Sequence, residues 1–139
     1  MSPHTVHRRF HDAELIAEPD NDLELRSLLA VGDSSVDLSI TWVRIDGQHQ
    51  RLRTEASTRI YVVVEGRGTV TVGEEPVTVD AGDVVVIPPG RPYHLQGDMT
   101  YLVLNQPGFR DGDDRYLDAD DEVVGTVPPP RTPPPAQER

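Results

Sequence analysis

Short runs of β-branched and apolar residues recur along the middle of the chain, and glycine, aspartate or proline closes each of them. Runs of four to eight such residues fit strands and are too short for helices, so the spacing predicts an all-β sandwich or barrel. Only residues 13–17 could begin a helix. The predicted strands are 23–30, 37–45, 60–65, 68–72, 76–79, 84–87, 93–96 and 100–105.

The two ends of the chain differ in composition from this central region. Residues 111–122 hold seven acidic side chains, and six prolines follow within residues 128–135. Proline donates no amide hydrogen, so the proline run predicts an extended polyproline segment outside the sheet. A calcium loop starting at Asp111 is rejected because Tyr116 falls where an EF-hand needs glycine. We therefore divide the chain of 139 residues into an N-terminal extension (1–20), one barrel domain (21–110) and an acidic, then proline-rich tail (111–139).

Charge and composition exclude several classes of function. The formal net charge is −11, so nucleic acid and anionic membranes are not expected as partners. The chain has no cysteine, which excludes disulfides, thiolate metal ligands and a cysteine nucleophile. No run approaches the ~20 apolar residues of a membrane span, and the first residues lack the apolar segment of a signal peptide. We expect a cytoplasmic protein.

Residues 47–105 resemble the cupin family of small double-stranded β-helix barrels, also described as jelly rolls. The resemblance rests on the segment IYVVVEGRGTVTV at 60–72 and on VDAGDVVVIPPG at 79–90, where a Gly-Asp pair, four apolar residues and Pro-x-Gly follow one another. It implies a barrel with a small-molecule cavity at its mouth, and the family habit implies a homodimer. The predicted strand at 23–30, which would otherwise leave an edge unpaired, suggests where a second copy pairs.

The family's metal ligands are not reproduced in this chain. Aligned on Gly47 and Gly66, the His-x-His and Glu positions of metal-binding cupins become Arg53, Glu55 and Arg59. The histidine of the second motif becomes Tyr93, with His94 one residue further on. Arginine has no lone pair for a metal. We therefore expect no metal cofactor, and keep a divalent metal at His94, Glu55 and His49 as the alternative.

The remaining histidines give no convincing cluster. His49 follows a turn glycine and is interpreted as a solvent-facing loop residue. His4, His7 and His11 lie in a basic N-terminal segment that is expected to be loosely ordered.

Strand parity predicts what replaces the metal. On an unbulged strand, Arg53, Glu55, Arg59 and Tyr61 point to one face, which in the family lines the barrel. Together with Tyr93 or His94 they predict a locally positive cavity for a small anionic organic substrate. We assign Glu55, Tyr61 and His94 as catalytic acid–base candidates. The substrate-binding candidates are Arg53, Arg59, Tyr93 and, as a stacking platform, Trp42.

This pattern favours metal-independent proton transfer, as in an isomerase, cyclase or dehydratase, and metal-free cupin-superfamily enzymes work in that manner. Two alternatives stay open. The barrel could be a non-catalytic ligand-binding or sensing module with Arg53, Glu55 and Arg59 as a structural ion cluster. It could also be a metal-dependent dioxygenase or isomerase that uses His94.

Overall fold

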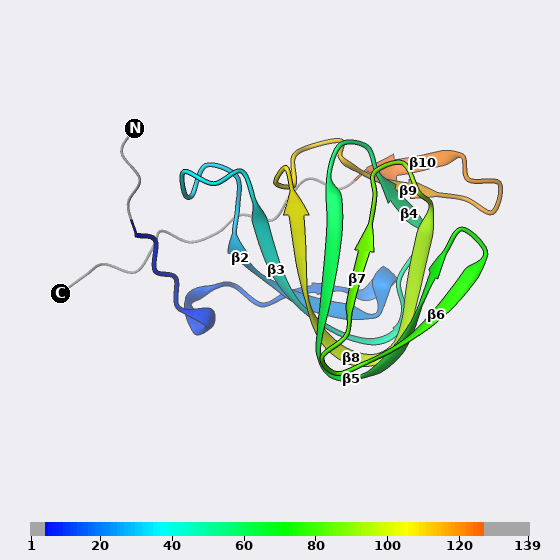
Figure 1. The fold of residues 1–139 in the computed structure, drawn as a ribbon, viewed down its shortest axis with the longest axis horizontal. Coiled ribbons are helices and arrows are strands. Elements are labelled where there is room, and N and C mark those ends of the chain that lie inside the picture. Colours follow the sequence, from blue (N-terminus) through cyan, green and yellow to red (C-terminus); the bar gives the residue numbers. More distant parts are fainter. Residues whose placement is uncertain (1–4, 127–139) are drawn as a thin grey trace.

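Residues 5–126, described here from a computed structural model, form a single curled sheet (Figure 1). The two helices in this range are three-residue 3-10 turns, η1 (Phe10–Asp12) and η2 (Pro19–Asn21), and neither is long enough to cross a membrane. The strands are β1 (Ile16–Glu18), β2 (Leu23–Leu29), β3 (Ser39–Gln48), β4 (Leu52–Thr54), β5 (Thr58–Val72), β6 (Glu75–Asp80), β7 (Val84–Ile87), β8 (Tyr93–Gln106), β9 (Asp114–Leu117) and β10 (Val123–Thr126).

The all-β barrel predicted from the sequence is confirmed, and two long strands form its frame. β5 and β8 pair antiparallel along almost their whole length, from Thr58 opposite Gln106 to Val72 opposite Tyr93. β3 flanks β8, while β7 and then β6 flank successive halves of β5. The strands predicted at 60–65 and 68–72 are therefore one bent strand, as are those at 93–96 and 100–105.

Glycines explain why the expected turns inside β5 and β8 are bends instead. Gly66 has φ +86°, and a Cβ there would collide with the carbonyl oxygen of Asp98 across the pair. Gly97 has φ +147°, and a Cβ there would lie 2.5 Å from the Cα of Gly68. Both strands thus curve sharply while they stay paired, which only glycine permits at these positions.

The register sorts side chains onto two faces of the β3–β8–β5 sheet. Three rows cross these strands and face the barrel interior: Ser39–Asn105–Arg59, Thr41–Val103–Tyr61 and Val43–Tyr101–Val63. Two rows lie between them on the outer face and continue onto β7: Ile40–Leu104–Ile60–Val86 and Trp42–Leu102–Val62–Val84. The inner rows carry most of the polar groups, and the outer rows are apolar.

The apolar core fills one half of the barrel and leaves the other half to polar side chains. Leu52, Leu95, Val70, Val79 and Ile87 are each at most 2% exposed and pack in one cluster. This packing closes the interior below the inner rows and fixes where β5 and β8 present their polar residues.

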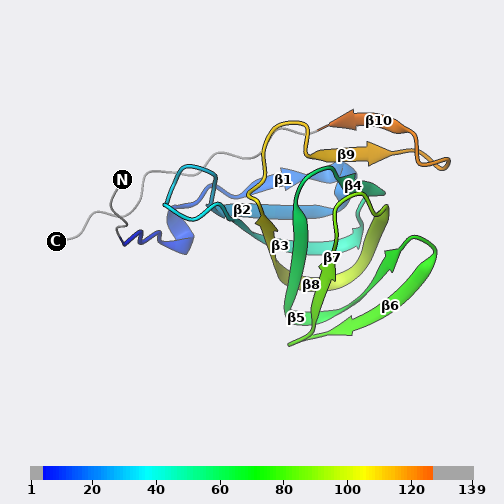
Figure 2. The ribbon, with the colours of Figure 1, turned by 45° about the horizontal axis from the view of Figure 1, so that its top comes forward.

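The fold extends beyond the boundaries expected from the sequence. Residues 13–17, where a helix was considered, lead into β1, which pairs with β2. Because β2 lies between β1 and β3, it is not the unpaired edge that was expected. β9 lies in the acidic segment, β10 follows it directly, and β9 pairs with β4 (Figure 2). The expected end of the barrel at residue 110 is therefore too early. His4 and the proline run at 128–135 lie outside the described residues.

Candidate active site

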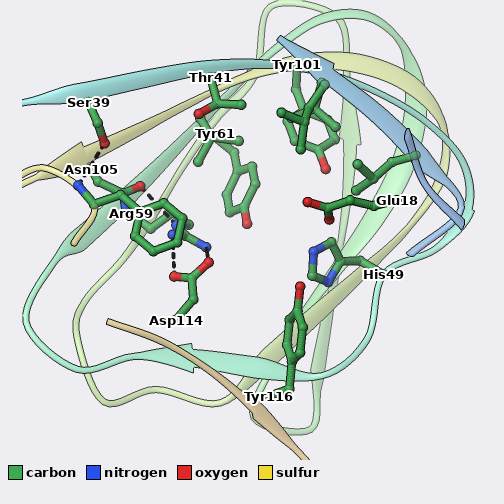
Figure 3. A pocket seen from close by; sticks show the side chains of 15 residues that line it. Glu18, Ser39, Thr41, His49, Arg59, Tyr61, Tyr101, Asn105, Asp114 and Tyr116 are labelled. Atoms are coloured by element: carbon green, nitrogen blue, oxygen red, sulfur yellow. Dashed lines mark hydrogen bonds and ion pairs between the residues drawn. The ribbon is translucent and has the colours of Figure 1, made fainter. Parts of the chain in front are cut away.

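A cavity opens between the inner rows and the segments that carry Glu18, His49 and β9 (Figure 3). The free volume within it is about 80 Å³, less than the ~300–1,000 Å³ of most small-molecule sites, and part of its boundary is open to solvent. Its lining combines apolar, aromatic and ionisable side chains. They are Glu18, Leu23, Leu25, Ser39, Thr41, Val43, His49, Arg59, Tyr61, Tyr101, Val103, Asn105, Phe109, Asp114 and Tyr116.

Arg59 is the only cation of this lining, and its charge is neutralised within the site. Its guanidinium forms two hydrogen bonds to the Asp114 carboxylate, at 2.5 and 3.1 Å. Nε donates to Oδ1 of Asn105 at 3.0 Å, and the Phe109 ring lies 5.8 Å from the guanidinium carbon. Both members of the ion pair are buried. A buried, fully bonded pair of this kind holds a fixed geometry but does not offer a free positive charge.

Three tyrosines continue from the guanidinium along the inner face of β5 and β8. Arg59 donates to the Tyr93 hydroxyl at 3.0 Å, and the hydroxyls of Tyr93 and Tyr61 are 2.6 Å apart. The Tyr61 ring packs edge-to-face against Tyr101, with 5.2 Å between centroids. Desolvation raises the pKa of all three phenols, although Arg59 acts to lower it in each case. They are therefore neutral hydroxyl groups near pH 7.

His49 reaches the same cavity from the segment between β3 and β4. Its ring lies between Glu18 and Tyr116 in Figure 3. Nδ1 lies 2.7 Å from the carbonyl oxygen of Gln50, and because a carbonyl only accepts, Nδ1 carries the proton. Nε2, which has no hydrogen-bond partner among residues 5–126, is then the unprotonated nitrogen. Desolvation lowers the pKa of His49 to about 4, so the ring is neutral and its Nε2 lone pair is unprotonated near pH 7.

The low pKa of His49 predicts a loss of stability in mild acid. Between about pH 6.5 and 4 the unfolded chain binds a proton at this ring and the folded chain does not. The contribution of His49 is complete above pH 6.5 and is lost as the pH falls to 4, on the order of 2–3 kcal/mol. Urea unfolding at pH 7.5 and 5, compared with His49→Gln, measures it. Equal pH slopes in the two proteins would contradict it.

Hydrogen bonds from Asn21 connect three segments beside the cavity. Asn21 Nδ2 donates to the Tyr116 hydroxyl at 3.0 Å and to the Glu18 carboxylate at 3.1 Å. Oδ1 of the same amide accepts from the backbone N–H of Gln50 at 2.9 Å, next to His49. η2, β9 and the His49 segment therefore hold one another in place over the cavity.

Arg53 and Glu55, both expected in the cavity wall, lie outside it. β4 ends at Thr54, and residues 55–57 form a bend before β5 begins. The bend reverses the alternation, because Leu52 and Thr54 are buried before it and Arg59 and Tyr61 after it. Arg53 points outward and pairs with Glu55 at 2.7 Å. The expectation that all four residues share one face is wrong for the first two, since it assumed an unbroken strand.

His94 and Trp42 also lie away from the cavity. Tyr93 and Leu95 face the interior, so His94 between them faces the other side of β8, where Nδ1 is 3.4 Å from a guanidinium nitrogen of Arg51. Trp42 belongs to an outer row and packs edge-to-face against Phe10 at 5.1 Å. Of the residues selected from the sequence, Arg59 and Tyr61 line the cavity, and Tyr93 lies directly behind them.

The cavity is not the positively charged one that the sequence suggested. Arg59 contributes one positive charge, while the Asp114 and Glu18 carboxylates contribute two negative ones. The neutral His49 ring and the phenols add none. The charges expected from Arg53 and Glu55 pair with each other outside. The cavity therefore contains hydrogen-bond donors and a neutral imidazole, and it lacks the positively charged anion-binding site that was expected.

The residues at the family's metal-ligand positions do not fit a metal. Arg59 occupies one and is bound to Asp114, and Tyr93 occupies another and bonds to Arg59 and Tyr61. No group of three or more His, Asp or Glu side chains with metal-binding geometry occurs between residues 5 and 126. No step is therefore assigned to a metal here.

Several cavity residues had no clear signal in the sequence. His49, Glu18 and Asp114 lie in or beside short connecting segments whose position depends on contacts with distant strands. Tyr101 and Asn105 could have been predicted from the sequence, because they alternate in phase with Tyr93 on the same strand. Tyr116 lies in the segment 111–139 that the composition predicts to be a tail outside the barrel.

Comparison with known families agrees with the fold. The sequence model of the cupin domain matches residues 41–104. Residues 41–104 are therefore a cupin domain. This cupin is 36% identical over 58 residues to an uncharacterized protein of Streptomyces coelicolor, and the match spans 40% of the chain and 55% of that protein. It covers about half the length of this relative.

Solved structures with the same fold include enzymes. The nucleoside dehydratase Pac13 superposes with a TM-score of 0.73 and 22% identity, covering 82% of this cupin and 92% of Pac13. Histidine-to-glutamine and tyrosine-to-phenylalanine variants of the Streptomyces protein have been solved with uridine. The polyketide cyclase RemF of Streptomyces resistomycificus superposes with a TM-score of 0.68 and 15% identity, covering 85% of this chain and 89% of RemF. At sequence identities this low, the similarity to these structures shows a shared fold and nothing about activity.

Proposed function

We propose that this cupin binds a small, neutral, hydroxyl-bearing carbonyl compound in its cavity and catalyses a metal-independent proton transfer, as in a dehydratase or isomerase. The observation that carries the proposal is a neutral imidazole whose free Nε2 shares a cavity with the hydroxyls of Tyr61, Tyr101 and Tyr116. A base and several weak acids around one space are what such chemistry requires.

His49 supports the role of the base. Its Nδ1–H is fixed on the carbonyl of Gln50, so the lone pair of Nε2 is available to the cavity. Its pKa of about 4 keeps that lone pair free throughout the neutral range. Glu55 and His94, the bases selected from the sequence, are not retained because neither lines the cavity.

Tyr61 supports the role of the acid. Its hydroxyl points toward the middle of the cavity in Figure 3, and the Tyr93 hydroxyl lies 2.6 Å from it. In a dehydration, Nε2 of His49 would take the proton from the carbon beside the substrate carbonyl, and Tyr61 would protonate the hydroxyl that leaves as water. The imidazolium then returns its proton to the phenolate. Protonation at carbon in place of water loss gives the isomerase.

Charge supports a neutral substrate over the anionic one expected from the sequence. The only cation of the lining is bonded to Asp114, and Glu18 adds a negative charge that has no ion-pair partner among residues 5–126 and opposes an anion. Asn105, Ser39 and Thr41 add uncharged polar groups among apolar walls. Uridine, a neutral polar ligand of the structural neighbour Pac13, is of the same chemical character. Nucleosides and related sugars are therefore the first compounds to test.

Binding and exchange together test the proposal. Uridine is titrated into the protein by calorimetry, and a panel of β-hydroxy carbonyl sugars and nucleosides is incubated in deuterium oxide. We expect the hydrogen on the carbon beside the carbonyl to be replaced by deuterium, which NMR measures. With some compounds we also expect an unsaturated carbonyl product. Binding without exchange by any compound would make the barrel a ligand-binding module. If no compound binds and none exchanges hydrogen, the proposal is refuted.

We also propose that the outer face of the sheet joins two copies of the chain. Its two apolar rows cross four strands, and Val84 and Val86 at their ends are 58% and 59% exposed. Strands about 4.8 Å apart make this an apolar band about 15 Å wide, larger than scattered surface residues produce. Apart from Trp42, which packs against Phe10, the side chains of the band are aliphatic, which suits packing of the same face against itself.

Light scattering after size exclusion tests the pairing. The unsubstituted protein is expected to have the mass of two chains, and Val84→Glu that of one, because the pair would bury two unpaired carboxylates. Val124→Glu is the matched control, since Val124 is 65% exposed on β10, away from the band. A monomeric unsubstituted protein, or a dimeric Val84→Glu variant, would contradict the proposal.

A further inference from the structure

Tyr93 is a buried phenol that does not line the cavity. Its side chain is 0% exposed, and it lies on β8 with the Arg59 guanidinium on one side and the Tyr61 hydroxyl on the other. Nothing in the acid–base scheme above assigns it a step. Burying a phenol costs free energy unless its hydroxyl is bonded, so its contacts define what it does.

The direction of the hydrogen bonds along this chain follows from the chemistry of its members. A guanidinium only donates, so the Tyr93 oxygen accepts from Arg59. The Tyr93 proton then needs an acceptor, and between residues 5 and 126 the only one within bonding distance is the Tyr61 oxygen at 2.6 Å. If Tyr61 donated instead, the Tyr93 proton would be left buried without a partner among residues 5–126, which is unfavourable.

From this geometry we propose that Tyr93 is a positioning residue: held by Arg59, it donates its proton to the Tyr61 oxygen and so leaves the Tyr61 proton to point into the cavity. This deepens the proposed function and rests on it for the role of Tyr61 as the acid. Arg59 thus donates to Tyr93, Tyr93 donates to Tyr61, and Tyr61 donates to an oxygen of the substrate.

The same arrangement makes Tyr61 the stronger acid of the two phenols. A donated hydrogen bond stabilises the phenolate that forms when Tyr61 gives up its proton, and the positive charge of Arg59 acts in the same direction. Both effects lower the pKa of Tyr61 against the larger desolvation effect that raises it. For Tyr93 the bond to Tyr61 acts oppositely and raises the pKa further. Tyr61 is thus expected to ionise first.

Proton NMR of the unliganded protein tests the direction of the bond without any substrate. The chain has four tyrosines, Tyr61, Tyr93, Tyr101 and Tyr116, so carbon-13-labelled tyrosine gives four ring systems. We expect a slowly exchanging hydroxyl proton coupled to the Tyr93 ring, and a faster one on Tyr61. A protected hydroxyl on Tyr61 in place of Tyr93 would overturn the proposal. Fast exchange of both would do so equally.

Tyr93→Phe tests the effect on Tyr61. The groups that face Tyr61 are Arg59 on its own strand, Tyr93 and Tyr101 on β8, and Asp114 on β9. Removing the Tyr93 hydroxyl is expected to raise the pKa of Tyr61, read from its ring carbon, by roughly one pKa unit. Tyr116→Phe, which removes a cavity hydroxyl held by Asn21, should leave that pKa unchanged. An unchanged pKa in Tyr93→Phe would refute the positioning role.

The proposed acid–base function and the positioning role of Tyr93 can be refuted independently of each other. If the hydroxyl assignment holds and no compound in the panel exchanges hydrogen, the acid–base function is refuted and the orientation of Tyr61 stands. If turnover is found, Tyr93→Phe is expected to slow it about tenfold and to move the alkaline limb of its pH profile with the pKa of Tyr61. Turnover with an unchanged profile would refute the positioning role alone. Where Tyr93→Phe does not fold, the hydroxyl assignment in the unsubstituted protein decides.

Discussion

Replacing Asp114 by alanine is expected to lower the free energy of unfolding by about 3–5 kcal/mol, the largest effect on stability that we predict. The substitution leaves the Arg59 guanidinium, whose side chain is 6% exposed, without its counter-charge inside the barrel. It also removes two hydrogen bonds that connect β9 to β5. A buried charge without a partner costs far more than the ion pair itself contributes.

Urea unfolding monitored by the single tryptophan measures this loss. Asp80→Ala is the matched control, because it removes the same side chain from the exposed pair with Arg67 and should have little effect. A double variant, Arg59→Met with Asp114→Leu, should recover most of the lost stability, since it removes both charges and keeps the volume. If Asp114→Ala were no more destabilising than Asp80→Ala, the buried pair would not hold β9 in place.

Replacing His49 by glutamine is expected to reduce hydrogen exchange or turnover by about 10²–10⁴-fold, the usual contribution of a positioned base. Glutamine keeps a polar side chain of similar reach but has no basic nitrogen. Binding of the same compound, measured by calorimetry, should change much less, because the other lining residues stay. The loss would then appear in kcat and not in KM.

The distribution of histidines supplies the control for this experiment. His94→Gln removes an imidazole on the outer side of β8, beside Arg51, and should leave the rate unchanged. Because the pKa of His49 is about 4, the rate of the unsubstituted enzyme should also stay level between pH 7 and 5, where an ordinary histidine would become protonated. Equal losses in both variants, or a rate that falls with a midpoint near 6.5, would contradict His49 as the base.

Of the two residues, Asp114 lies outside the cupin-domain match, and His49 lies inside it in the segment between β3 and β4. The cupin-domain match ends at residue 104, yet Asp114 and Tyr116 on β9 complete the cavity and Glu18 lies before the match begins. The inner rows on β3, β5 and β8 supply the frame and the phenols. The charged and basic groups that decide the chemistry come largely from the segments that close the barrel.

The fold could be predicted because its signal is local. Alternating runs such as 60–72 and 79–90 fit only strands, and glycine and proline mark their limits, so the strands at 23–29, 84–87 and along β5 and β8 followed from the sequence. The three-residue strands β1 and β4 carry too few residues for a pattern. β9 and β10 were missed because acidic composition outweighed a four-residue alternation.

What the sequence determined by itself was an acidic, cysteine-free cupin barrel without the family's metal ligands and with Arg59 and Tyr61 on its inner face. Only the tertiary structure decided which other groups join them. A bend at residues 55–57 turns Arg53 and Glu55 outward, since a change of one residue in strand phase moves every following side chain to the opposite face. His49, Asp114 and Glu18 enter the cavity because distant segments hold them there, and no local pattern encodes a contact between residues so far apart in the chain.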